Sequence, residues 1–298
     1  MTPLLTKDLR LAADAMRPWA LGVGLLVLAA TAIAAVSSDL RPRLLADLSW
    51  PELMQLISLA VIFSAVAMGA WVAVVVVRGD ETHGARNLAM ALPVSPRAGG
   101  GLKLGVMLAS TLVVAAVASV LSLAQARGAG SGESFYLGAL YGVGTLVLGL
   151  VGLAHGAVFA RLVRGTFAPV AASCGLIVLW FAGAMIAGRL GFGVFGREIT
   201  ELAQSTGEPW RAIVPADRAA FNAAAAGVGS ASLALLLTAV AALLTNASRR
   251  AVAVGLGVAA VACFVVAALS VPVSIANDPS LDSWTAYSPV VAPAATTK

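Results

Sequence analysis

Few residues in this sequence are of a type that carries out chemistry. Its 298 residues include two His and two Cys, and no GxxxxGK[ST], HExxH or GxSxG pattern occurs. Without a phosphate-binding loop, the chain does not bind and hydrolyse ATP by that route. Cys174 and Cys263 lie inside apolar runs, as small apolar side chains do, and two His are too few for the usual His-based metal site. We predict a chain that is not an enzyme and binds no cofactor or metal.

His155 lies within an apolar run, where an ionisable side chain often marks a proton relay or a substrate contact. No Asp, Glu, Lys or Arg lies in the middle of any other apolar run, so a relay would lack a second member. We therefore expect a neutral His155 that is hydrogen-bonded to a neighbouring helix. The missing carboxylates also disfavour a secondary transporter driven by protons or sodium.

The polar segment that separates the early apolar runs spans residues 78–103, RGDETHGARNLAMALPVSPRAGGGLK. It follows VAVVVV and precedes LGVMLASTLVVAAVASVLSLA, so it must lie in water between two membrane crossings. The acidic pair Asp80–Glu81 favours the N-terminus of a short helix, and Pro93 ends that helix. Pro96 and the three glycines after it predict an irregular chain before the next crossing.

Part of this segment resembles the coupling helix in the permease subunits of ABC type-2 transporters. The matching residues are Glu81, Gly84, Leu88, Leu92, Pro93, Val94, Ser95, Arg97 and Lys103. The family has Gly directly before the Lys, where this chain has Leu102. The resemblance implies contact with a separate ATPase subunit through Asp80, Glu81, Gly84, Arg86, Leu88, Leu92, Pro93, Arg97 and Lys103. The alternative for this segment is an ordinary cytoplasmic loop whose arginines orient the chain.

The composition places the chain among helical membrane proteins. Hydrophobic residues make up 60% and charged residues 11%, with a mean hydropathy of +0.94, whereas charged residues approach a quarter of a soluble domain. Several apolar windows are long enough to cross a hydrocarbon core of about 30 Å as helix. The predicted spans are about 19–36, 53–77, 104–124, 135–159, 167–188, 223–244 and 251–271. The net charge of +5 reflects membrane topology, and we expect no nucleic-acid partner.

Three further segments flank these spans. Residues 1–17 carry an apolar and a basic face, which predicts a helix lying in the membrane interface. This matches the elbow helix of the resembled family; a solvated extension is the alternative. Residues 191–222 mix aromatic, acidic and basic residues, which predicts one or two short interfacial or re-entrant helices. Residues 18–250 would form a six-span core, 251–272 an extra span and 273–298 an extended extracytoplasmic tail.

The basic residues indicate an orientation. With the N-terminus in the cytoplasm, inside segments hold eleven of the nineteen Lys and Arg residues. These are Lys7, Arg10, Arg17, Arg78, Arg86, Arg97, Lys103, Arg161, Arg164, Arg249 and Arg250. Because cytoplasmic loops are enriched in cations, we predict a cytoplasmic N-terminus and, with seven spans, an extracytoplasmic C-terminus.

Gly149, Gly152 and Gly156 lie on one face of the fourth span and predict a close helix contact. The sequence leaves open whether the partner helix belongs to the same chain or to a second copy.

The resemblance implies the permease subunit of an ATP-driven exporter in a bacterial cell membrane. It implies two ATPase subunits, which bind ATP and Mg²⁺, and a second permease, identical or different. The apolar spans suggest a hydrophobic or amphipathic cargo, with membrane lipid around them. The rival function is a non-transporting scaffold or sensor that binds partners through its outer loop and tail.

Overall fold

The structure, a computed structural model, describes residues 2–35, 50–82, 95–125, 131–205, 207 and 212–278, and these residues form helices without strands. The helices are α1 (Thr2–Ala35), α2 (Trp50–Thr82), α4 (Pro96–Gln125), α5 (Ser131–Leu162), α6 (Phe167–Phe195), α7 (Arg197–Ser205), α8 (Ile213–Thr245) and α9 (Arg249–Ala276). All but α7 are long and apolar enough to cross a membrane, so seven candidate spans are present. The prediction of a polytopic helical membrane protein with seven spans is confirmed at this level.

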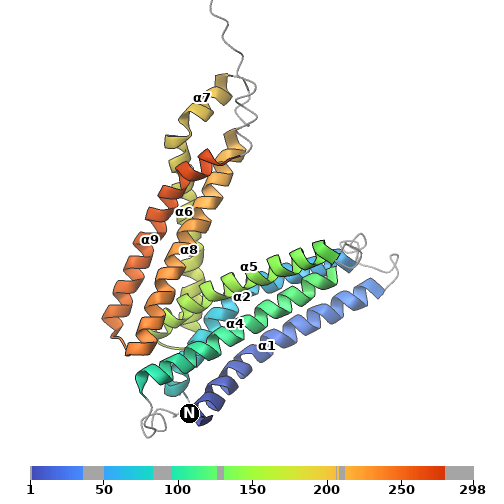
Figure 1. The fold of residues 1–298 in the computed structure, drawn as a ribbon, viewed down its shortest axis with the longest axis vertical. Coiled ribbons are helices and arrows are strands. Elements are labelled where there is room, and N and C mark those ends of the chain that lie inside the picture. The colour runs from blue at the N-terminus through green and yellow to red at the C-terminus, as the bar shows by residue number, and fades with distance from the viewer. Residues whose placement is uncertain are drawn as a thin grey trace, which may run out of the picture. The chain divides into compact units, whose positions relative to one another are not determined.

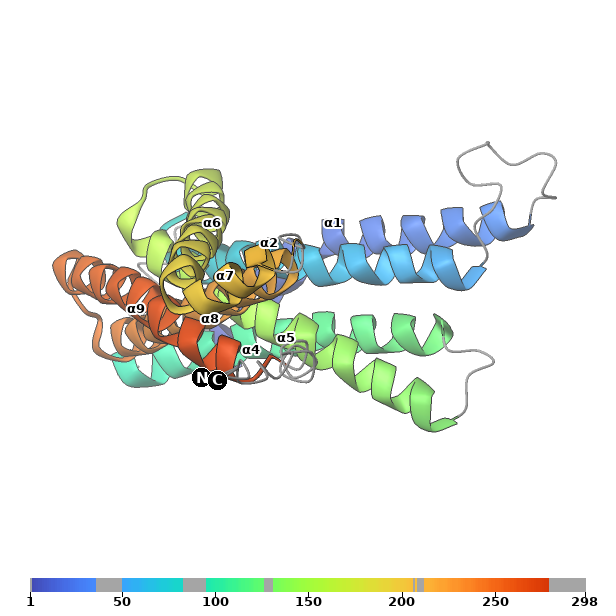
Figure 2. The same cartoon turned by 90° about the horizontal axis from the view of Figure 1, so that it is seen from above.

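The chain divides into two compact units (Figure 1). Unit 1 comprises Met1–Ile177 with Ser232–Ala259, and unit 2 comprises Val178–Ala231 with Ala260–Lys298. In unit 1, α2, α4 and α5 pack against one another and α1 lies along α2 and α4. Figure 2 shows α1 beside α2 in a second view. Met54 and Val61 of α2, Ala30 of α1 and Ala118 of α4 form a buried cluster where these three helices meet.

Glycines bring the backbones of α2 and α5 into direct contact. A Cβ on Gly152 would lie 1.9 Å from the carbonyl oxygen of Val66, and one on Gly156 would lie 2.5 Å from that of Ala70. Gly149 also faces α2, since a Cβ on Gly69 of α2 would lie 2.2 Å from the carbonyl oxygen of Gly149. The predicted glycine face therefore packs inside the chain, and α2 occupies the surface that a second copy would need.

The N-terminal region is one helix, not two. An interfacial helix over residues 1–17 followed by a separate span was predicted, with Pro18 in the first turn of that span; α1 instead runs unbroken from Thr2 to Ala35 and contains Pro18. The predicted division at Pro18 is wrong because a proline removes one N–H donor from a helix but does not necessarily end it. The indole Nε1–H of Trp19, directly after the proline, donates to Ser64 Oγ of α2 at 2.9 Å and fixes α1 there.

The ends of the polar segment also differ from the prediction. Asp80 and Glu81 were expected to begin a short helix, but α2 continues through them to Thr82. Residues 96–101 were expected to be irregular, but α4 begins at Pro96. Ser95 accepts a hydrogen bond from the amide of Ala98 at 3.3 Å, so it caps this helix, and Pro96 occupies the first helical position, which requires no N–H donor.

Unit 2 contains the segments of α6, α8 and α9 that adjoin the short helix α7 (Figure 1). Small residues let these helices approach: a Cβ on Gly188 of α6 would lie 2.7 Å from Ala220 Cα of α8. Ser230 of α8 donates to the carbonyl of Ala262 of α9 at 3.2 Å. The prediction of a short helix within 191–222 is confirmed by α7, but its bounds were too wide, since α6 extends to Phe195 and α8 begins at Ile213.

The last span was predicted to end near residues 271–272, with an extended tail over 273–298. Instead α9 continues through Pro272 to Ala276, and the amide of Asn277 donates to Val273 O at 3.2 Å. Most of the predicted tail, residues 279–298, lies outside the described residues.

Candidate functional site

A buried arginine at the end of α2 holds the end of α5. Arg78 is 9% exposed, and its Nε–H donates to the carbonyl of Ala160 at 2.8 Å. Its two terminal nitrogens donate to the carbonyls of Val163 and Gly165. These three acceptors belong to the last turn of α5 and the turn that follows it, where a helix has carbonyls without internal partners and a partial negative charge. Arg78 thus supplies both the donors and the opposite charge.

The turn between α5 and α6 gives Arg78 these acceptors. Gly165 has a φ of +88°, which places it in the left-handed region where glycine carries no steric penalty. The chain can therefore reverse at this point, with α5 ending at Leu162 and α6 beginning at Phe167. Phe167 lies against Trp71 of α2, with ring centroids 5.1 Å apart. Two contacts from α2 therefore position the start of α6.

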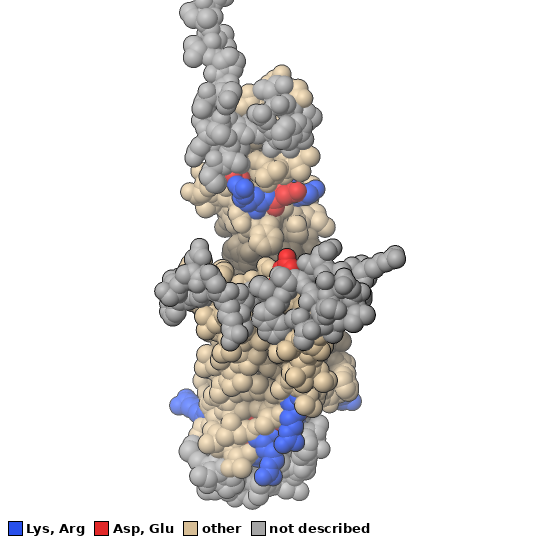
Figure 3. All heavy atoms as spheres, turned by 90° about the vertical axis from the view of Figure 1, so that its right-hand side faces the viewer, with Lys and Arg blue, Asp and Glu red and all other residues tan. Residues whose placement is uncertain are grey.

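Two more cations bind backbone carbonyls at this end of unit 1. Lys103 Nζ of α4 donates to Val77 O of α2 at 3.4 Å, and Arg161 of α5 donates to Ala247 O, in the α8–α9 turn, at 3.4 Å. Figure 3 shows basic side chains gathered at one end of unit 1. We call Arg78, Lys103 and Arg161 the basic anchors. They join the end of α2, the start of α4, the end of α5 and the α8–α9 turn.

The predicted coupling residues fall partly inside this region. Asp80 and Glu81 belong to the last turn of α2, and Arg97 and Lys103 lie in the first turns of α4. Arg97 is exposed, whereas Lys103 is half-buried. Gly84, Arg86, Leu88, Leu92 and Pro93 lie outside the described residues. The structure therefore places both ends of the predicted coupling segment at one place and is silent on its middle.

No family model, curated protein or solved structure matches this chain. Any function proposed for the chain therefore depends on its own chemistry and geometry. Among the residues that the structure describes, no group of three His, Cys, Asp or Glu is placed to hold a metal ion.

His155 was predicted to bond to a neighbouring helix. It is fully buried, and its Nδ1 lies 2.8 Å from the carbonyl of Val151, one turn earlier in α5 itself. Because a carbonyl only accepts, Nδ1 carries the proton in this contact.

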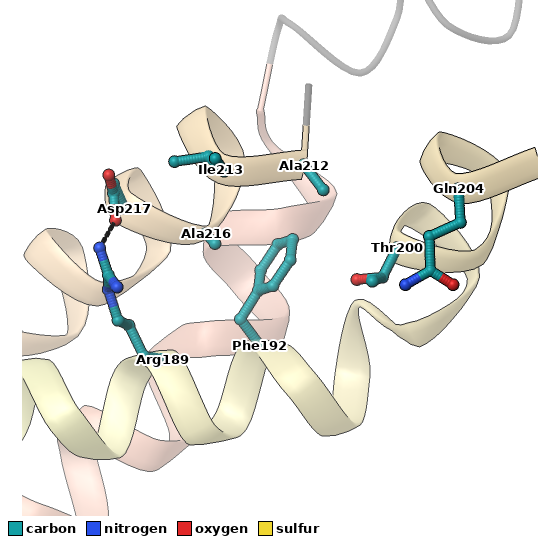
Figure 4. A pocket seen from close by; sticks show the side chains of 8 residues that line it. All are labelled: Arg189, Phe192, Thr200, Gln204, Ala212, Ile213, Ala216 and Asp217. Atoms are coloured by element: carbon teal, nitrogen blue, oxygen red, sulfur yellow. Dashed lines mark hydrogen bonds and ion pairs between the residues drawn. The ribbon is translucent and has the colours of Figure 1, made fainter. Parts of the chain in front are cut away.

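Unit 2 contains a hollow of about 330 Å³ between α6, α7 and the start of α8 (Figure 4). It is lined by Arg189, Phe192, Thr200, Gln204, Ala212, Ile213, Ala216 and Asp217. Arg189 and Asp217 form an ion pair between α6 and α8 on one side. Thr200 and Gln204, one turn apart on α7, lie on the other side, with the Phe192 ring between the two polar groups.

Further polar contacts join the helices around this hollow. Arg218 of α8 pairs with Asp278, just beyond α9, whose side chain is 2% exposed. One turn along α8, Asn222 Nδ2 donates to Ser274 Oγ of α9 at 2.8 Å. Figure 3 shows basic and acidic side chains lying against each other in unit 2. This mixed charge differs from the gathered cations at the end of unit 1.

Sequence reasoning missed the specific roles of two arginines. Arg78 was counted only among the cations that orient the chain, although it follows an apolar run without a polar residue between. A cation so close to an apolar helix needs acceptors inside the fold, and this was the available signal. Arg189 falls just after the predicted span 167–188 and Asp217 falls within the predicted interfacial segment 191–222. Nothing in their spacing of 28 residues indicates that they pair.

Proposed function

We propose that this chain is the membrane-spanning subunit of an ATP-driven ABC type-2 exporter, moving a hydrophobic or amphipathic cargo and powered by a separate ATPase. The observation that carries the proposal is the anchoring of the polar segment's two ends. Arg78 fastens the end of α2 to the α5–α6 turn, and Lys103 fastens the start of α4 to α2. A loop that only orients the chain does not need such attachment.

This attachment gives a route for mechanical coupling. An ATPase that displaces residues 80–92 would exert force first on the end of α2. Because Arg78 donates hydrogen bonds to Ala160, Val163 and Gly165, this force is transmitted to the end of α5 and to the turn before α6. The close α2–α5 contact leaves little room for one helix to move without the other.

The order of elements also supports the proposal. The resembled family has six spans, with short extracytoplasmic helices between the fifth and sixth. Here α7 is a nine-residue helix between α6 and α8, the fifth and sixth candidate spans. In this proposal α7 lies outside the cell, the basic anchors lie inside, and α9 is an addition to the six-span plan.

The proposed assembly contains two copies of the ATPase subunit and a second permease, identical or different. The ATPase subunits bind ATP and Mg²⁺, and the permease contributes Asp80, Glu81, Gly84, Arg86, Leu88, Leu92, Pro93, Arg97 and Lys103 to the contact with them. The bacterial cell membrane is the proposed location. With seven spans, the N-terminus lies in the cytoplasm and the C-terminus outside.

The proposal is tested by co-purification from detergent with an ATPase encoded beside this chain. The double variant Glu81→Ala with Leu88→Ala should lose the ATPase that the wild type retains. A matched control is Glu198→Ala with Leu202→Ala, the same two substitutions on α7 at the other end of the candidate spans, which should retain it. Equal retention by all three proteins, or by none, would refute the coupling assignment.

The hollow in unit 2 favours a second candidate, a non-transporting scaffold or sensor that responds to a small ligand through the region around α7. A sensor of this kind needs no ATPase. It predicts that changes in residues 80–92 leave its activity intact, whereas changes around the hollow abolish it.

A further inference from the structure

We propose that the hollow in unit 2 binds the headgroup of a zwitterionic phospholipid of the ethanolamine class. In this arrangement Arg189 binds the phosphate and Asp217 binds the ammonium group. The inference concerns the residues of unit 2 alone and does not depend on an ATPase partner.

The charges of the hollow call for a ligand that carries both signs. Arg189 and Asp217 pair through one nitrogen and one oxygen, and their side chains remain 61% and 49% exposed. A guanidinium has five N–H donors and a carboxylate two acceptor oxygens, so each can bind a ligand while the pair persists. A simple anion would face the carboxylate, and a simple cation would face the guanidinium. A ligand with adjacent phosphate and ammonium groups satisfies both.

The rest of the lining suits the glycerol and ester part of such a lipid. Thr200 Oγ1 donates to Gly196 O at 3.1 Å, which leaves this oxygen to act as an acceptor toward a ligand. The exposed amide of Gln204 can donate to an ester carbonyl. Between these groups and the ion pair, Phe192 offers an apolar surface for methylene groups. The volume of 330 Å³ is at the small end of ligand sites, as expected for a headgroup whose acyl chains remain outside.

The helix lengths place the hollow at headgroup depth. With a rise of 1.5 Å per residue, the 29 residues of α6 span about 43 Å, which exceeds a hydrocarbon core of about 30 Å. Arg189 lies in the last two turns of α6 and Asp217 in the second turn of α8. Beside them Leu190, Val194 and Val214 are more than half exposed, as expected for side chains in contact with acyl chains.

The test is native mass spectrometry of the full chain in detergent with equal amounts of phosphatidylethanolamine, phosphatidylglycerol or phosphatidylcholine. The wild type should bind the ethanolamine lipid most tightly. Arg189→Gln should weaken the binding of phosphatidylethanolamine and of phosphatidylglycerol alike, by about tenfold, as expected for loss of a charged hydrogen bond. Asp217→Asn should weaken the binding of phosphatidylethanolamine only, and should strengthen the binding of the anionic phosphatidylglycerol.

Controls separate ligand binding from folding. Arg197→Gln breaks the ion pair between Arg197 and Glu201 on α7. Neither residue lines the hollow, so this variant should change no lipid affinity. Gln204→Leu keeps the Arg189–Asp217 pair and should weaken the ethanolamine lipid without lowering the unfolding temperature. The proposal is overturned if Arg189→Gln and Asp217→Asn weaken the binding of phosphatidylethanolamine and phosphatidylglycerol equally. It is overturned as well if the wild type binds the three lipids with the same affinity. It is also overturned if soluble glycerophosphoethanolamine competes as strongly as the lipid.

Discussion

Arg78 shows how a single residue reconciles an apolar helix with a buried charge. Removing a charged group from water costs several kcal/mol unless opposite charge and hydrogen bonds compensate for it. The compensation comes from the carbonyls of Ala160, Val163 and Gly165. The arginine in turn supplies donors to carbonyls at the end of α5 and in the turn that follows, where a helix lacks internal partners.

Replacing Arg78 with alanine should therefore destabilise the protein by about 3 kcal/mol or more, since buried carbonyls lose charged donors. Arg78→Lys should recover only part of this loss, because an ammonium group cannot reach three carbonyls in a planar fork. Thermal unfolding in detergent provides the measurement. The control is Arg164→Ala, an exposed arginine in the same turn, which should change the unfolding temperature little. Equal effects at the two positions would show that the contacts of Arg78 do not stabilise the fold.

At the scale of elements, unit 1 is built by close packing of α2, α4 and α5. Small residues let helices approach in a membrane, where there is little hydrophobic drive for association. The contacts of Gly69, Gly152 and Gly156 bring α5 against the backbone of α2 over more than two turns. The proposed transmission of force from residues 80–92 through α2 to α5 requires a stiff helix pair of this kind.

Two glycines of α5 test this packing with the same substitution. Gly152→Ala places a Cβ 1.9 Å from Val66 O and should cost about 1–3 kcal/mol, the usual range for overpacking. Gly144→Ala has no atom within 4 Å of its new Cβ and should be neutral or stabilising by about 0.5–1 kcal/mol through helix propensity. Unfolding in detergent distinguishes them. If Gly152→Ala is as harmless as Gly144→Ala, the α2–α5 contact is not as close as described.

The sequence predicted the elements better than their ends. Long apolar windows identified all seven candidate spans, because length and hydropathy are local properties. The ends were wrong where a helix continues through polar residues, as α2 does through Asp80 and Glu81, and where Ser95 caps a helix that glycines were expected to disrupt. The interfacial helix of residues 1–17 was wrongly separated from its span at Pro18.

The site was less predictable than the fold, because its contacts are long-range. Arg78 and Ala160 are separated by 82 positions in the sequence, and no pattern in that stretch indicates their pairing. The pairing of Arg189 with Asp217 likewise depends on how α6 and α8 cross. Local periodicity identifies helices, whereas contacts between distant residues follow from packing that a single sequence does not reveal.

At the scale of the whole molecule, contact with a cytoplasmic ATPase depends on how the chain is oriented in the membrane. A cytoplasmic N-terminus places the α2–α4 segment inside the cell and α7 outside. Orientation follows from Lys and Arg near span ends, of which the basic anchors are part. Arg97 and Ser205 are both exposed, and in the proposed orientation they would lie on opposite sides of the membrane.

Labelling of single cysteines tests this orientation. In a variant with Cys174→Ala and Cys263→Ala, a membrane-impermeant maleimide added to intact cells should label Ser205→Cys. It should label Arg97→Cys only after the membrane is permeabilised. The reverse pattern would place the polar segment outside and remove the basis for contact with a cytoplasmic ATPase.

The most direct test of the central claim is cross-linking from the polar segment to the ATPase. With the native cysteines replaced, Arg86→Cys would be treated in membranes with a bifunctional maleimide reagent, alongside Ser205→Cys as the matched position on α7. The account predicts an ATP-dependent cross-link to the ATPase subunit from position 86 and none from position 205. No cross-link from position 86, in membranes where both proteins are present, would contradict it.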